Sequence, residues 1–91
     1  MWRVEYTDIA ESSLLKLDKP VRDRILAFFR DRIENAEDPK TLAESLSGEL
    51  RGLYRYRVGD YRMICDIRKL VTVVLVLEVG HRSSIYRKTG R

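Results

Sequence analysis

The segment LVTVVLVLEVG, residues 70–80, limits the possible folds most, because it is β-branched and apolar on both faces of a strand. Such a run fits a strand that is central in its sheet or well covered. Its longest apolar stretch, VTVVLVL, is far below the roughly 20 residues that span a bilayer. The N-terminal MWRVEYTD lacks the apolar core of a signal peptide. We therefore expect a cytoplasmic protein without membrane contact, built around a buried strand.

The rest of the chain alternates between strand and helix patterns. Residues 2–6 alternate apolar and charged side chains, as a half-buried strand does. Apolar residues then recur at helical spacing in two segments, which Asp18-Lys19-Pro20 separates. Three strand patterns follow, at about residues 50–58, 60–68 and 70–79. The sequence predicts an α+β fold of order β-α-α-β-β-β, with two packed helices on a mostly antiparallel four-stranded sheet.

Local signals place the ends of these elements. Thr7 or Asp8 can cap the first helix. Residues 40–47 favour one or two further helical turns, anchored by Leu42 and Leu46. The 91 residues are enough for one small domain, which we expect to span 1–91.

A basic and aromatic stretch, GELRGLYRYRVGDYR, fills residues 48–62. If residues 53–58 form a strand, Arg55 and Arg57 share one face, and Tyr54 and Tyr56 share the other. The Gly59-Asp60 pair then favours a tight turn, which brings Arg62 back beside them on a second strand. This pattern predicts a basic surface on a rigid hairpin, which suits an anionic partner.

The charge distribution agrees with that surface. The net charge is +4; acidic side chains outnumber basic ones before Gly48, and basic ones outnumber acidic ones after it. Such asymmetry favours nucleic acid or an acidic protein as the partner. The single cysteine, Cys65, allows no intramolecular disulfide and has no metal-ligand spacing around it, so we interpret it as a small buried hydrophobe. No cofactor or metal is expected.

The candidate catalytic residues follow the hairpin and the last strand. They are Arg55, Arg57, Arg62, His81, Arg82 and Tyr86. Cleavage of RNA by its own 2′-hydroxyl needs a base, an acid and positive charge for the pentavalent phosphorane. Arginine grips phosphate through its planar fork but transfers protons poorly, which leaves His81 and Tyr86 for proton chemistry. The alternative is structural: the arginines keep a sheet face soluble and pair with Glu78 or Asp66, and the tyrosines belong to the core.

At these residues the chain resembles the RelE branch of the RelE/ParE toxin superfamily. The segments that carry the resemblance are LSGELRGLYRYRVGDYRMICDI at 46–67 and VLEVGHRSSIYRK at 76–88. The resemblance implies a RelE-like microbial RNase fold and a toxin of a type II toxin–antitoxin system. It further implies a ribosome-dependent endoribonuclease that cleaves mRNA in the A site of the 70S ribosome. The implied partner is a RelB-like antitoxin, with operator DNA bound only through the toxin–antitoxin complex.

The resemblance also assigns roles to individual residues. Arg55 and Arg57 occupy basic strand positions, which are often lysine in the family. Arg62 and Arg82 match phosphate-stabilising arginines, and Tyr86 matches the tyrosine that orients or activates the nucleophile. Because arginine donates protons reluctantly, we hypothesise that His81 supplies the acid. Two alternatives remain open: a ParE-type inhibitor of DNA gyrase with the same fold, and an inactive relative that only binds its antitoxin or RNA.

Overall fold

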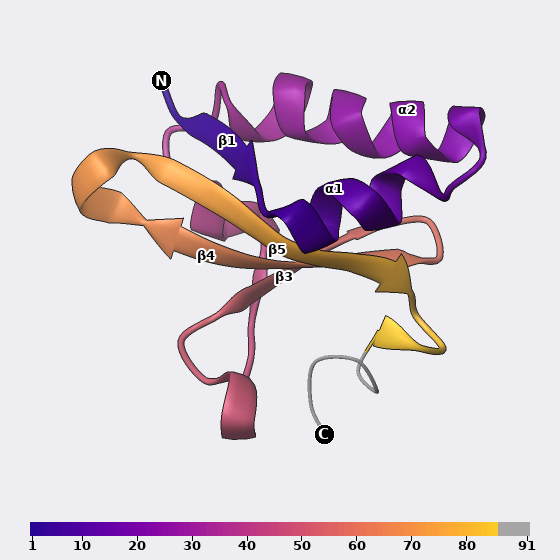
Figure 1. Ribbon diagram of the computed structural model, residues 1–91. Helices are drawn as coiled ribbons and strands as arrows, with labels where there is room; N and C mark the ends of the chain where they lie inside the picture. Colours follow the sequence, from indigo (N-terminus) through magenta and orange to yellow (C-terminus); the bar gives the residue numbers. More distant parts are fainter. Residues whose placement is uncertain (86–91) are drawn as a thin grey trace.

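A computed structural model describes residues 1–85 and confirms the α+β class (Figure 1). The helices and strands are β1 (Arg3–Tyr6), α1 (Asp8–Leu15), α2 (Lys19–Phe28), β2 (Glu44–Ser45), β3 (Tyr54–Val58), β4 (Tyr61–Arg68) and β5 (Val73–His81). The strands form one sheet of order β1-β5-β4-β3-β2, in which β1 runs parallel to β5 and the other pairs are antiparallel. Within residues 1–85 the sheet therefore has five strands where the sequence predicted four.

The additional strand is β2, and it replaces part of the predicted helical segment. Only Pro39–Leu42 forms a short 3-10 turn, after which the chain becomes extended and pairs Glu44 with Arg55. The hydroxyl of Tyr56 donates a hydrogen bond of 2.6 Å to the carbonyl oxygen of Pro39 and holds this turn against β3. A strand of two residues leaves no alternation pattern in the sequence. The prediction of helical turns over residues 40–47 was therefore wrong for residues 44 and 45, which form a strand.

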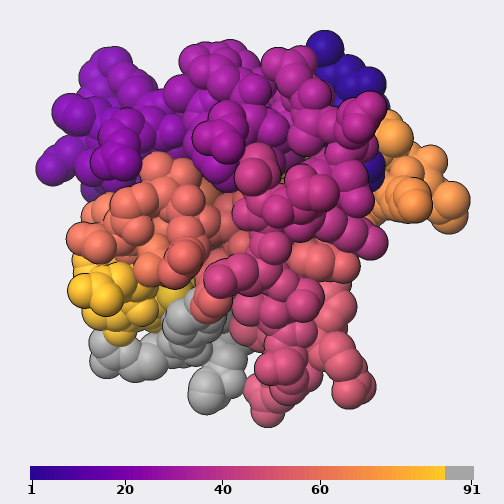
Figure 2. Space-filling model, turned by 180° about the vertical axis from the view of Figure 1, so that it is seen from behind, coloured from indigo at the N-terminus to yellow at the C-terminus, as the bar shows by residue number. Residues whose placement is uncertain are grey.

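The prediction for the apolar segment is confirmed, because β5 lies between β1 and β4. The strand begins at Val73, later than expected, since Lys69–Val71 form a 3-10 turn and Thr72 turns the chain with a φ of 50°. Figure 2 shows this β4–β5 turn (orange) projecting from the body of the molecule, and the Leu70 side chain at its tip is fully exposed.

Both helices lie on the same side of the sheet (Figure 1). The hydroxyl oxygen of Thr7 accepts the Ala10 N–H and caps α1, as one of the two predicted caps. Helix α2 continues into a π-helical turn at Phe29–Ile33. The core between helices and sheet consists of Ala10, Leu14, Ile25, Phe29, Ile33, Tyr56, Met63, Cys65, Val74, Val76 and Val79. Cys65 is thus buried, as predicted.

Neither α1 nor α2 lies on the opposite face of the sheet, which residues 82–85 close at one end (Figure 1). Ile85 is fully buried there against Gly80: a Cβ at Gly80 would lie only 2.9 Å from the Ile85 Cδ1. The rest of this face presents the arginines of β3 and β4. Within residues 1–85, no helix has both the length and the apolar character needed to cross a membrane.

Candidate nucleic-acid interface

The β3–β4 hairpin fixes which side chains share a face. The two-residue turn Gly59-Asp60 forms as predicted, with a φ of 58° at Gly59 that a side chain would disfavour. Across the hairpin, Arg57 lies opposite Arg62, and Tyr56 lies opposite Met63. Because directly opposed residues point to the same side of a sheet, the two arginines face away from the helices. Tyr56 enters the core, which confirms the predicted separation of arginines from tyrosines.

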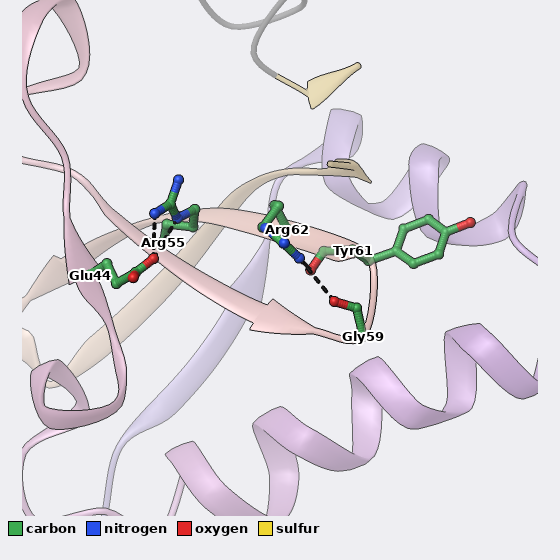
Figure 3. A network of polar contacts seen from close by, with 5 residues as sticks. All are labelled: Glu44, Arg55, Gly59, Tyr61 and Arg62. Atoms are coloured by element: carbon green, nitrogen blue, oxygen red, sulfur yellow. Dashed lines mark hydrogen bonds and ion pairs between the residues drawn. The ribbon is translucent and has the colours of Figure 1, made fainter. Parts of the chain in front are cut away.

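Arg62 folds back over the hairpin turn. Its Nη1 donates to the carbonyl oxygens of Gly59, at 3.0 Å, and of Tyr61, at 3.1 Å (Figure 3). On β5 its register partner is Gly80, which has no side chain to compete for the space. The guanidinium is therefore held by two neutral acceptors.

Arg82 reaches the same turn from the end of β5. Its backbone N–H donates to the carbonyl oxygen of Asp60 at 2.8 Å, and its Nε lies 3.5 Å from the Asp60 Oδ1. The side chains of both partners are more than half exposed, so this ion pair contributes little to stability. The structure thus brings three predicted site residues, Arg57, Arg62 and Arg82, around one turn; we call them the turn cluster.

Arg55 lies two residues before Arg57 on the same face and is paired with Glu44 of β2. Its Nε donates to the Glu44 Oε1 at 2.8 Å, and its Nη2 donates to the same oxygen (Figure 3). Hydrogen bonding and the positive charge of Arg55 hold the pKa of the Glu44 carboxyl below its usual range, and the charges of Arg57 and Arg62 act in the same direction. The positive charges of Arg57 and Arg62 therefore act as far as the edge strand β2.

Glu44 was not identified from the sequence as a partner of Arg55. The sequence suggested Glu78 or Asp66 as ion-pair partners for the site arginines instead. Asp66 instead accepts a hydrogen bond of 2.9 Å from Arg68, two residues away on β4. Glu44 precedes Arg55 by 11 residues and joins it only because β2 lies beside β3. A two-residue strand gives no periodic signal that could have revealed this contact.

His81 is not brought together with the turn cluster. It lies opposite Tyr61, and the two rings meet edge to face with centroids 5.5 Å apart. Tyr61 packs against the core, so this pair belongs to the helix-covered side of the sheet. The His81 Nδ1 lies 3.1 Å from the Ser83 backbone nitrogen, whose N–H donates to it, and 2.8 Å from the Ser83 Oγ. The remaining predicted site residue, Tyr86, lies outside the described residues.

Comparisons with known proteins agree with this architecture. Residues 4–86 match the family model described as ParE toxin of type II toxin-antitoxin system, parDE. Toxin RelG of Mycobacterium tuberculosis is 32% identical over 88 residues, which cover 96% of this chain and 98% of that protein.

Solved structures of toxin–antitoxin complexes are similar as well. The toxin-antitoxin complex RelBE2 of Mycobacterium tuberculosis matches with a TM-score of 0.79 and 28% identity, over 89% of this chain and 98% of that chain. The archaeal RelE-RelB complex of Pyrococcus horikoshii matches with a TM-score of 0.69 and 30% identity, over 89% and 94%. The chain therefore belongs to the RelE/ParE superfamily of toxins from type II toxin–antitoxin systems.

Proposed function

We propose that this toxin is a RelE-type, ribosome-dependent endoribonuclease that cleaves mRNA in the ribosomal A site. The observation that supports the proposal is the turn cluster, in which Arg57, Arg62 and Arg82 surround the tight turn of the β3–β4 hairpin. A nuclease that lets the 2′-hydroxyl attack the adjacent phosphorus must stabilise the extra negative charge of the phosphorane. Guanidinium groups supply that charge and bind two phosphate oxygens at once.

The chemistry requires one bond to form and one to break. The 2′-oxygen bonds to phosphorus and loses its proton, while the bond to the 5′-oxygen breaks and that oxygen gains a proton. We assign charge stabilisation to the turn cluster and proton transfer to Tyr86 and His81. In the arrangement described, the His81 ring faces Tyr61, so it would have to leave Ser83 to reach the phosphate. Unchanged cleavage by His81→Gln would remove it from the mechanism.

The deciding experiment is cleavage of mRNA on programmed ribosomes with an empty A site, comparing wild type with Arg82→Ala. We expect a 100- to 1000-fold slower cut at the A-site codon, on the scale of one lost transition-state donor. Arg68→Ala is the matched control, because Arg68 is also an exposed, ion-paired arginine but lies at the far end of β4. Cleavage that is as fast in Arg82→Ala as in wild type would contradict the proposed site, and no cleavage by wild type would contradict the activity.

A gyrase inhibitor is the second candidate, because the matching family model is described as a ParE toxin. A supercoiling assay with purified gyrase, run beside the ribosome assay, separates the two activities. Gyrase inhibition without mRNA cleavage would place the protein in the ParE branch. Inactivity in both assays would favour a protein that only binds its antitoxin or RNA.

The proposed regulatory partner is a RelB-like antitoxin, since the similar structures are RelE–RelB and RelBE complexes. A basic toxin face suits a flexible acidic segment that folds as it binds and covers the arginines. Operator DNA would then be contacted only through the complex.

A further inference from the structure

A hollow of about 270 Å³ lies at the sheet edge beside the arginine face. It is lined by Phe28, Leu42, Glu44, Arg55 and Arg57, and we call it the edge hollow. It exists because β2 is short: Ser45 and Glu44 pair with Tyr54 and Arg55, whereas the second half of β3 has no strand partner on this side within residues 1–85. Cavities of about 150 Å³ hold a benzene ring, so the edge hollow is large enough for a nucleobase.

The walls of the edge hollow differ in character. Phe28 and Leu42 supply apolar surface, and Leu42 is 41% exposed. Arg55 supplies a guanidinium whose side chain is only 26% exposed and whose Nε and Nη2 are both bound to one Glu44 oxygen. A guanidinium fixed in this way offers a flat surface, and unstacked RNA bases stack on arginine planes.

On the side formed by Arg55 and Glu44, the charges of the edge hollow favour a base over a phosphate. The Glu44 carboxylate neutralises much of the Arg55 charge and would repel a phosphate placed beside it. Arg57 lies about 7 Å further along the strand and is exposed, which leaves it for the phosphate of the same nucleotide. The two arginines of β3 thus have different environments, although they share one face.

We propose that the edge hollow binds one nucleobase of the RNA substrate, stacked on Arg55, and that Glu44 is the positioning residue that holds Arg55 flat. The inference rests on the proposed function, because it names a subsite of the same RNA-binding face. It assigns recognition of the substrate base to β2 and the turn before it, and phosphate binding to the turn cluster.

The test compares intact mRNA with mRNAs that lack a single base at each position of the A-site codon and its two neighbours. On programmed ribosomes, wild type should cut one abasic mRNA about tenfold more slowly, the scale of one stacked base. Glu44→Gln should cut intact mRNA at about the rate at which wild type cuts that abasic mRNA, and should lose the difference between the two substrates. Leu42→Ser should reduce the same difference. Glu49→Gln, an exposed carboxylate on the neighbouring 3-10 turn, should behave as wild type.

Two results would overturn the inference. The first is that Glu44→Gln cuts RNA and still cuts the abasic mRNA more slowly than the intact mRNA by the full wild-type factor, which we call the abasic penalty. The second is that wild type cuts every abasic mRNA as fast as the intact one. A loss of fold would lower the melting temperature and slow all substrates alike, so it cannot imitate a lost abasic penalty. If wild type cuts no mRNA, the proposed function fails separately from this inference. Fluorescence anisotropy with intact and abasic hexanucleotides then tests whether the edge hollow binds a nucleobase. Equal affinity for both hexanucleotides would contradict the inference.

Discussion

Tyr56→Phe removes one oxygen atom from the centre of the fold. The Tyr56 side chain is fully buried, its ring contacts Phe28 and Phe29 edge to face, and its hydroxyl donates to the Pro39 carbonyl at 2.6 Å. Phenylalanine keeps the ring and its packing, so the substitution isolates the hydrogen bond. Pro39 is itself buried, so the substitution leaves a buried carbonyl without this donor.

The expected cost follows from the group left behind. A buried carbonyl that loses its partner costs about 1–3 kcal/mol, and we take about 2 kcal/mol here. For a domain of this size, that corresponds to a fall of roughly 8–16 °C in the melting temperature. The Glu44–Arg55 pair should also loosen, because Pro39 begins the turn that leads into β2.

Urea unfolding and thermal unfolding, followed by circular dichroism, measure both quantities. Tyr54→Phe is the matched control: Tyr54 is half-buried on the same strand, and Phe retains the ring that lies 5.6 Å from the Lys40 Nζ. It should stay within about 0.5 kcal/mol of wild type. If Tyr56→Phe also stays within about 0.5 kcal/mol of wild type, the Pro39 bond does not hold the turn, and the account of how β2 is positioned is wrong.

Three further expectations concern other parts of the chain. Burial raises the pKa of the Cys65 thiol, so the unfolded chain loses this proton first, and stability falls as the pH rises above the pKa of the thiol in the unfolded chain. Between about pH 8 and about pH 9.5, the free energy of unfolding of wild type should fall by about 1 kcal/mol more than that of Cys65→Ala, measured by urea unfolding. Equal losses in the two proteins would contradict this expectation. Thr72→Gly should raise the melting temperature by about 4 °C, because glycine tolerates the φ of 50°; Thr72→Ala should not, and an equal gain for both would exclude backbone strain as the cause. The association rate with the antitoxin should fall at least tenfold between low and high salt in stopped-flow experiments, and a rate independent of salt would exclude electrostatic steering.

The sequence determined those elements whose side-chain pattern repeats. The β-branched run at 70–80 predicted the covered strand that forms from Val73 onward, the alternation at 53–58 separated arginines from tyrosines, and Gly59-Asp60 turned the chain. These inferences depend on local periodicity and backbone preference, which act within a few residues. They were sufficient to predict the α+β class and the convergence of Arg57 with Arg62.

Only the tertiary structure decided contacts between segments that share no pattern. Glu44 reaches Arg55 because a two-residue edge strand docks on β3, and Arg82 joins the turn cluster because β5 ends beside Asp60. His81 is adjacent to Arg82 in the chain, but its ring meets Tyr61 on the helix-covered side of the sheet, because the pairing of β4 with β5 fixes the phase of the strand that ends at His81. The residue types present are thus a property of the sequence, whereas their common position depends on strand register and sheet order, which long-range packing sets.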